Sequence, residues 1–206
     1  GFIEESQHIL DKYKNDIQVL DLGENQGMQT ALNLAVYNAT NEFLVIINDD
    51  NVLSKDWDKL ILDKAQEGFV FTINQIEPIG PGIFNFPVKN LGHTPEDFKY
   101  DEFIEYELRL REKDILTRDG GIFPFAMYKK DYMIVGGFDT LYKSPFICDW
   151  DFFLKLDLNG IVFKRTHEAC LYHFGSTATK NGKEGEMFKS TEQPAAQLFM
   201  YKWGIS

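Results

Sequence analysis

The stretch Phe43-Leu44-Val45-Ile46-Ile47-Asn48-Asp49-Asp50 decides the fold expected for this chain, because an apolar run leads directly into an acidic turn. A short run that is apolar at every position is typical of a strand buried on both faces of a sheet. In open α/β sheets, ligands bind at the carboxyl ends of the strands. The stretch therefore predicts a buried strand with a candidate binding turn immediately after it.

The segments around this stretch alternate between helical and strand-like patterns. Helices are predicted at residues 2–13, 28–39, 54–66, 94–113, 129–135, 150–158 and 195–203. Strands are predicted at residues 17–22, 69–73, 122–128, 161–163 and 169–173. Such alternation is typical of an α/β domain with a mostly parallel, Rossmann-like central sheet flanked by helices. At 206 residues we expect a single domain, 1–206, with an irregular, proline-containing insertion at 78–121.

Composition narrows the classes of function. The chain has 21 Lys and Arg against 32 Asp and Glu, a net charge of −11, which disfavours nucleic acid and anionic lipid as partners. Aromatic residues make up 15%, which indicates a packed core and excludes a disordered chain. No apolar stretch approaches the ~20 residues of a membrane helix. The two cysteines form neither a disulfide framework nor a zinc site, so we expect free thiols in a reducing compartment.

The acidic turn is a candidate cation site. Clustered carboxylates are costly unless a positive charge lies between them, and a hard divalent cation takes oxygen ligands. The alternative is a turn that only caps the next helix, and the spacing does not decide between the two. His173 ends the strand predicted at 169–173. A lone histidine is more often structural than a ligand, although manganese accepts imidazole beside carboxylates.

Three further carboxylates, Asp139, Asp149 and Asp151, are candidates for acid–base chemistry. Asp139 follows a flexible Gly136-Gly137 pair, and the other two open a predicted helix. Stabilisation of the helix dipole is the structural alternative for them. Residues two apart on a helix point about 200° away from each other. We therefore expect only one of Asp149 and Asp151 to face a cleft.

Taken in order, these residues resemble family 2 glycosyltransferases of the GT-A fold. The matching motifs are an Asn-x-Gly turn before a helix, an Asp-x-Asp-like turn, a Gly-Gly-Phe-Asp loop, a Glu-Asp-x-Asp-like helix and a late strand that ends in His. In this chain they stand at 25–27, 48–50, 136–139, 148–151 and 172–173. The resemblance implies inverting transfer of a sugar from a nucleotide-diphosphate sugar to an acceptor hydroxyl, with Mn²⁺ or Mg²⁺ as cofactor and a cytoplasmic location, or a peripheral one at a membrane face.

The resemblance also implies a role for each matched residue. Asp149 would be the general base, without needing a strongly raised pKa, and Asp50 and His173 would be metal ligands. The residues implied to bind the donor are Asn25, Gly27, Asn33, Asn48, Asp49 and Ser176. Those implied to bind the acceptor are Gly137, Phe138, Asp139, Trp150 and Asp151. Apart from the resemblance, the three glycines and few apolar anchors of segment 175–190 predict a mobile lid that orders over the donor.

The chain departs from the family pattern at three places. Asn48 stands at the first acid of the Asp-x-Asp motif, and Cys148 stands at the Glu of the helix motif. The family's first strand, helix and strand are expected to precede Gly1. These departures keep open a non-catalytic glycan- or nucleotide-binding module that retains the fold. A nucleotidyltransferase is disfavoured because no glycine-rich, lysine-bearing phosphate loop is visible.

Overall fold

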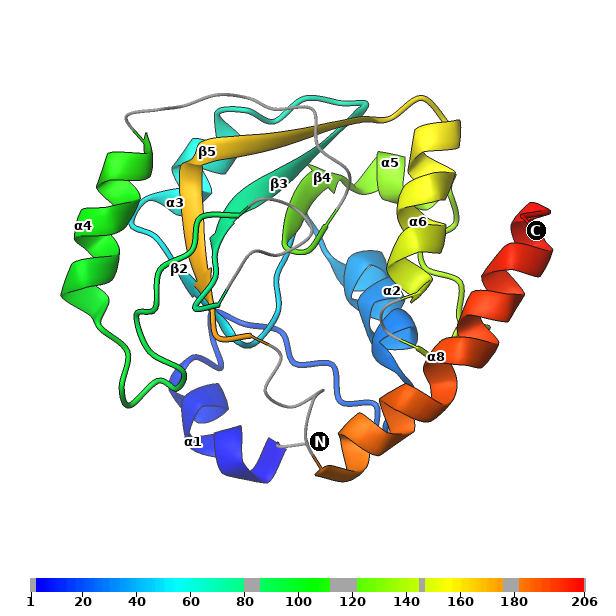
Figure 1. Cartoon of the computed structure of the whole chain (residues 1–206), viewed down its shortest axis with the longest axis horizontal. Coiled ribbons are helices and arrows are strands. Elements are labelled where there is room, and N and C mark those ends of the chain that lie inside the picture. Colours follow the sequence, from blue (N-terminus) through cyan, green and yellow to red (C-terminus); the bar gives the residue numbers. More distant parts are fainter. Residues whose placement is uncertain (1–2, 80–85, 112–121, 145–146, 176–181, 206) are drawn as a thin grey trace.

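The computed structural model describes residues 3–79, 86–111, 122–144, 147–175 and 182–205 (Figure 1). The helices are α1 (Ile3–Lys12), α2 (Met28–Asn38), α3 (Trp57–Leu62), α4 (Tyr100–Arg111), α5 (Lys129–Ile134), α6 (Ile147–Leu158) and α8 (Gly182–Trp203). The strands are β1 (Phe43–Ile46), β2 (Asn51–Leu53), β3 (Phe69–Ile76), β4 (Phe125–Tyr128) and β5 (Val162–His173). The fold is α/β, as the sequence predicts. In the described part of the chain, no helix is both long and apolar enough to cross a membrane.

The strands form one mixed sheet in the order β1-β4-β3-β5-β2. Only β3 and β5 pair in parallel, and the other described pairs are antiparallel. The expectation of a mostly parallel sheet is therefore wrong. An apolar run indicates that both faces of a strand are covered, but it does not indicate whether the neighbouring strand runs parallel or antiparallel to it.

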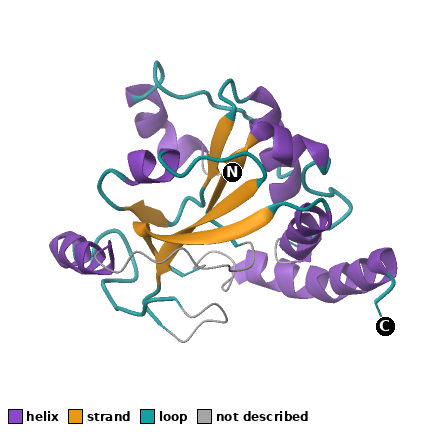
Figure 2. Ribbon diagram, turned by 90° about the horizontal axis from the view of Figure 1, so that it is seen from above, coloured by secondary structure: helices purple, strands orange, loops and turns teal. Residues whose placement is uncertain are grey.

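The sheet is curled, and the acidic turn bridges its two edges. β1 and β2 lie at opposite edges, yet only residues 47–50 separate them. Five flat strands at about 4.8 Å spacing would hold these edges about 19 Å apart, close to the full reach of so short a connection. Curling brings the edges nearer, and Figure 2 shows the strong curvature of the sheet. The predicted binding turn thus lies across the end of the sheet.

Side chains alternate between the two faces of the sheet. Phe125 and Met127 of β4 pack in a core with residues of α2, α5, α6 and α8, whereas Ala126 packs against Ile61 of α3 on the other face. Beyond β5, Phe103 of α4 joins a third cluster that is rich in aromatic rings. The helix predicted at 94–113 thus packs on the core through α4.

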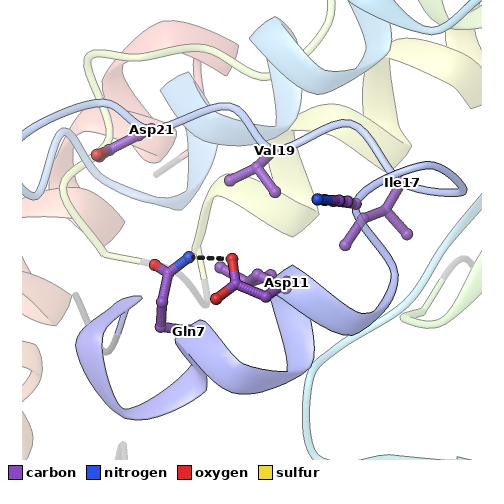
Figure 3. A pocket seen from close by; sticks show the side chains of 7 residues that line it. Gln7, Asp11, Ile17, Val19 and Asp21 are labelled. Atoms are coloured by element: carbon purple, nitrogen blue, oxygen red, sulfur yellow. Dashed lines mark hydrogen bonds between the residues drawn. The ribbon is translucent and has the colours of Figure 1, made fainter.

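The segment 17–22 is not a strand, which corrects the prediction from its period-two pattern. Ile17 and Val19 remain 43% and 49% exposed, and none of the described strands pairs with this segment. Alternation favours a strand only where a neighbour can take up its backbone hydrogen bonds. A hollow of about 410 Å³ lies between α1 and this segment, where Gln7 donates a hydrogen bond to Asp11 (Figure 3).

Two helices begin later than predicted. α3 starts at Trp57 because residues 51–53 form β2, and Ser54 then accepts a 3.3 Å hydrogen bond from the backbone of β5. α4 starts at Tyr100 because the Asp97 carboxylate closes a turn on residues 93–94 instead of capping a helix. In both cases a short polar side chain is used for a turn or a strand contact, which competes with helix capping.

Two predicted strands, 161–163 and 169–173, form the single strand β5. Its pairing with β3 changes register between Ile73 and Asn74, whose partners are Thr166 and Cys170. β5 thus has extra residues opposite a single step of β3, as in a β-bulge. Residues 182–190 of the segment expected to be a mobile lid begin helix α8, and the lid itself stays a prediction. Residues 176–181, and with them Ser176, lie outside the described residues.

Candidate active site

The acidic turn and the end of β5 meet as the sequence predicts. Pairing of β2 with β5 sets Asn51 opposite His173. The Phe174 amide donates a 3.1 Å hydrogen bond to the carbonyl of Asp50, which fixes the turn against the strand. The His173 Nε2 atom then lies 3.1 Å from Asp50 Oδ2. Two candidate metal ligands, 123 positions apart by residue number, are thus adjacent.

His173 lies between two carboxylates. Its Nδ1 atom is 3.0 Å from Oε1 of Glu77, which follows β3 directly. Burial alone would lower the pKa of His173, but the hydrogen bonds and charges of Asp50 and Glu77 outweigh burial and raise this pKa to about 9. Glu77 was missed in the sequence, because nothing near it in the chain marks it as a partner of a histidine 96 residues away.

The Asp50–His173 pair fits a divalent cation that is shared with a bound phosphate. In the described part of the chain, no three His, Cys, Asp or Glu side chains converge on one point. Mg²⁺ commonly uses one or two protein ligands plus substrate phosphates, at 2.0–2.1 Å and in octahedral geometry. Ligands on neighbouring corners of such a shell lie about 3 Å apart. The 3.1 Å separation of these two atoms matches that spacing.

Asp149 stands in the first turn of α6, whose other residues anchor the helix in the main core. The thiol of Cys148 donates a weak 3.5 Å hydrogen bond to its Oδ1 atom. Burial raises the pKa of Asp149 to about 7, and the single thiol contact offsets burial only slightly. The role of general base expected for Asp149 from the sequence did not require a raised pKa. In Figure 1, α6 stands at the right of the molecule, and β5 ends left of its centre.

Asp151 points to the other side of α6, as the helical spacing predicts. It is fully buried and its Oδ1 atom accepts hydrogen bonds from Tyr142 at 3.1 Å and Trp203 at 2.9 Å. Lys202 of α8 lies 2.8 Å from both Asp151 and Asp139. Burial alone would raise the pKa of Asp139, but the lysine hydrogen bond contributes to a lowered value. These contacts fasten α8 to α6.

Trp150 lies between the two carboxylates in sequence and is 59% exposed. Its ring and that of Phe199 of α8 are packed edge to face at a centroid distance of 6.0 Å. The roles in acceptor binding expected for Trp150, Asp139 and Asp151 stay predictions.

Asn33 of α2 holds the glycine loop that follows α5. Its Oδ1 atom accepts hydrogen bonds from the Phe138 amide at 2.9 Å and the Tyr132 hydroxyl at 2.7 Å. Its Nδ2 atom donates to the Phe138 carbonyl at 2.8 Å. The side chain expected to bind the donor therefore already makes three hydrogen bonds to two protein residues, and it sets the backbone path of Gly137 and Phe138.

Gly137 is expected to be far less tolerant of alanine than its neighbour Gly136. Both have positive φ, 67° and 74°, so each alanine costs about 1–2 kcal/mol of folding free energy. A Cβ at Gly137 would also lie 2.4 Å from Asn33 Oδ1, whereas one at Gly136 meets open space. We expect Gly137→Ala to cost roughly 1–3 kcal/mol more than Gly136→Ala in chemical denaturation. Equal costs would contradict the close approach to Asn33.

The remaining predicted donor residues lie in turns. Asn25 Oδ1 accepts a 2.9 Å hydrogen bond from the Gly27 amide, so the Asn-x-Gly turn is preformed. The Asn48 amide donates to Asn51 Oδ1 at 3.2 Å, which closes the acidic turn, and Asp49 is exposed. The Asn51 side chain thus closes the turn, which also presents Asp50 to His173. The turn leads into β2 and does not cap α3, whose N-cap is Asp56, so the alternative of a turn that only caps the next helix is wrong.

The fold and the acidic turn are those of a sugar-transferring class of α/β proteins, and the comparisons agree. A family model described as "Glycosyl transferase family 2" matches residues 3–135, more than half of the chain. The chain belongs to this family. Among curated proteins, none matches the sequence.

Two solved glycosyltransferase structures are similar in fold. One is the crystal structure of GalNAc-T7 with UDP, GalNAc and Mn²⁺, with a TM-score of 0.61 and 14% identity over 82% of this chain. The other is S. aureus TarS 1-349, with a TM-score of 0.54 and 16% identity over 95% of this chain. This chain covers 35% and 52% of the two neighbours. At such identities the likeness establishes the GT-A fold.

Proposed function

We propose that the chain carries the active site of an inverting, metal-dependent glycosyltransferase, which moves a sugar from a nucleotide-diphosphate sugar to an acceptor hydroxyl. The observation that carries the proposal is the Asp50–His173 pair, set 3.1 Å apart by the turn and strand of a family 2 fold. Because the GalNAc-T7 structure holds UDP and Mn²⁺, a UDP-sugar with Mn²⁺ is the first combination to test.

In this proposal Asp50 and His173 hold Mn²⁺ or Mg²⁺ beside the donor diphosphate. The bound cation supplies charge neutralisation for the diphosphate as it leaves the sugar. The half-buried pair restricts water around the leaving group, since the two side chains are only 28% and 13% exposed. Asn25, Gly27, Asn48 and Asp49 would contact the donor from their turns, and Asn33 would act by fixing the glycine loop. A donor contact is also proposed for Ser176.

Asp149 is proposed as the general base that accepts the proton of the attacking hydroxyl. A base works best when its pKa lies near the operating pH, and burial places the pKa of Asp149 at about 7. No covalent intermediate is needed, because a single displacement inverts the anomeric carbon. Trp150 offers an exposed ring on which an acceptor sugar can stack, and acceptor contacts are also proposed for Gly137, Phe138 and the Asp139–Lys202 pair.

Replacing Asp50 by Ala is expected to abolish the metal-dependent part of nucleotide binding. Asp50 is a partly exposed turn residue whose side chain supports little core, so the fold should persist. Calorimetry of UDP binding with and without Mn²⁺ measures the effect, and Asp58→Ala, an exposed carboxylate at the start of α3, is the matched control. An Mn²⁺-dependent gain in UDP affinity that survives in Asp50→Ala would contradict the proposed ligand.

A measurement of turnover distinguishes the proposed enzyme from a non-catalytic binding module. The departures at Asn48 and Cys148 leave Asp149 in place, so we expect the wild-type chain to hydrolyse or transfer sugar from the UDP-sugar that it binds. Tight, metal-dependent binding of UDP-sugar without any release of UDP would identify a non-catalytic module. Determination of the anomeric configuration of the product then tests whether the transfer inverts it.

A further inference from the structure

Glu77 belongs to the metal-binding part of the site without being placed to bind the metal itself. Its Oε1 atom lies 3.0 Å from Nδ1 of His173, on the side of the imidazole opposite Asp50. Gln75 of β3 reaches the same point, with its Nε2 atom 2.8 Å from Nδ1 and in hydrogen-bond contact with the Glu77 carboxylate. Both groups therefore lie beside Nδ1, the ring nitrogen that faces away from the candidate metal position.

The chemistry of these groups keeps a hydrogen on Nδ1. An ionised carboxylate only accepts hydrogen bonds, so a 3.0 Å contact with Nδ1 is favourable only if Nδ1 carries hydrogen. Gln75 Nε2 is also a donor, so its hydrogen goes to Glu77 and not to the ring, and Glu77 accepts from both groups. Nε2 faces the Asp50 carboxylate at 3.1 Å and carries a hydrogen there without metal, and a cation bound beside Asp50 would displace this hydrogen while Glu77 retains the one on Nδ1.

The backbone holds Glu77 firmly in this position. Its N–H donates to the Pro87 carbonyl at 3.0 Å, and its carbonyl accepts from the Lys89 amide at 2.9 Å. The same insertion is tied to β5 next to His173, because the Tyr172 hydroxyl donates to the Gly92 carbonyl at 2.5 Å. The carboxylate and the imidazole are thus anchored to one segment, which limits their relative movement.

We propose that Glu77 is a positioning residue for the metal ligand His173: it fixes the ring orientation and holds the proton on Nδ1, so that Nε2 is presented to the cation. This inference rests on the proposed function. Carboxylates that accept a hydrogen bond from a ligating histidine typically contribute 10–100-fold to metal affinity or activity. Glu77 is 18% exposed and 3.0 Å from the ring, so it can make this contribution without reaching the metal.

The test uses two variants of Glu77 and two measurements on the full chain. Glu77→Gln keeps an oxygen that can accept from Nδ1, whereas Glu77→Leu keeps similar bulk and has no acceptor. We expect a hydrogen-bonded Nδ1–H proton of His173 in ¹H–¹⁵N spectra of the metal-free wild type and Gln variant, and its loss in the Leu variant. We expect the affinity for Mn²⁺ in the presence of UDP to fall 10–100-fold in Leu and to stay within about threefold in Gln.

The outcomes separate the positioning role from its alternatives. Equal loss of Mn²⁺ affinity in both variants would make Glu77 a direct ligand and overturn the inference, as would wild-type affinity in Glu77→Leu or a missing Nδ1–H proton in the wild type. Glu105→Leu, an exposed glutamate on α4, controls for removal of a charge, and thermal unfolding controls for folding. If the wild type itself binds no Mn²⁺ with UDP, the proposed function fails as well.

Discussion

Asp149→Asn is expected to lower turnover by roughly 10²–10⁴-fold, the usual contribution of a positioned general base. The substitution keeps the shape of the side chain and removes its basicity. The affinity for the donor nucleotide should stay near the wild-type value, because Asp149 lies on α6 and the proposed metal ligands lie on the acidic turn and β5. Initial rates at saturating UDP-sugar, with calorimetry of UDP, measure the two effects separately.

The matched variants show whether the correct carboxylate has been chosen. Asp157→Asn, an exposed position on the same helix, should leave turnover unchanged. Normal turnover in Asp149→Asn together with loss in Asp139→Asn or Asp151→Asn would place the base elsewhere. If all these variants are active, a carboxylate base on this surface is not part of the mechanism.

The pH dependence follows from the same side chain. Because burial raises the pKa of Asp149 to about 7, the base is protonated and inactive below this pH. The wild-type kcat/KM should therefore rise with pH and level off above about pH 7, and this limb should be missing in the residual activity of Asp149→Asn. A wild-type profile that is flat from pH 5 to 8 would contradict the role of Asp149.

Stability should change in the opposite direction to activity. The folded-state pKa of about 7 lies above the ordinary value of 3.8, so between these values the folded chain holds a proton that the unfolded chain has released. Asp149 thus lowers stability progressively as pH rises from about 4 to 7, by up to about 4 kcal/mol. Asp149→Asn should be more stable than wild type at pH 8 and nearly equal at pH 4.

Asp151→Ala is expected to have the largest effect on stability, about 3–5 kcal/mol, the cost of breaking a buried ion pair from one side. The fully buried carboxylate accepts from Tyr142 and Trp203 and pairs with Lys202 and with the more buried Lys155. Its removal leaves the tyrosine and tryptophan donors without this acceptor. Denaturant unfolding measures the loss, and Asp157→Ala on the exposed side of α6 should cost less than about 1 kcal/mol.

The contacts of Asp151 also predict which part of the molecule loosens. Trp203 and Lys202 are near the end of α8, so the variant should raise hydrogen exchange in α8 before it affects β3. Uniform protection of α8 in wild type and Asp151→Ala would show that apolar packing of residues such as Ala195 is sufficient to dock the helix.

The elements that the sequence predicts correctly are those with a strong local pattern. The apolar run at 43–47 gives β1, and helical spacing after Gly27 gives α2. β2 could not be predicted, because its three residues overlap the acidic turn and it exists only through its pairing with β5. The direction of the strands could not be predicted either, because an apolar pattern indicates which faces of a strand are buried and not how the strands are ordered or oriented in the sheet.

The candidate site shows the same division. Asp50, Asp149 and His173 are predicted from the order of the motifs, and the structure brings Asp50 and His173 together. Glu77 was missed because its role depends on a contact between β3 and β5 that no local motif encodes. The burial of Asp151 was also inaccessible, because its partner Trp203 lies 52 residues further along the chain.

The irregular pairing of β5 has a consequence for how the chain tolerates changes in length. Three residues, 167–169, separate the partners of Ile73 and Asn74, and they make their own contacts, including the 3.3 Å hydrogen bond from Cys170 Sγ to the His167 carbonyl. A slip of one residue turns every following side chain to the opposite face of a sheet. The extra residues 167–169 can take up an insertion or deletion in residues 162–166, so that His173 still faces Asp50. The first part of β5 can therefore change in length without turning the side chain of His173 to the other face of the sheet.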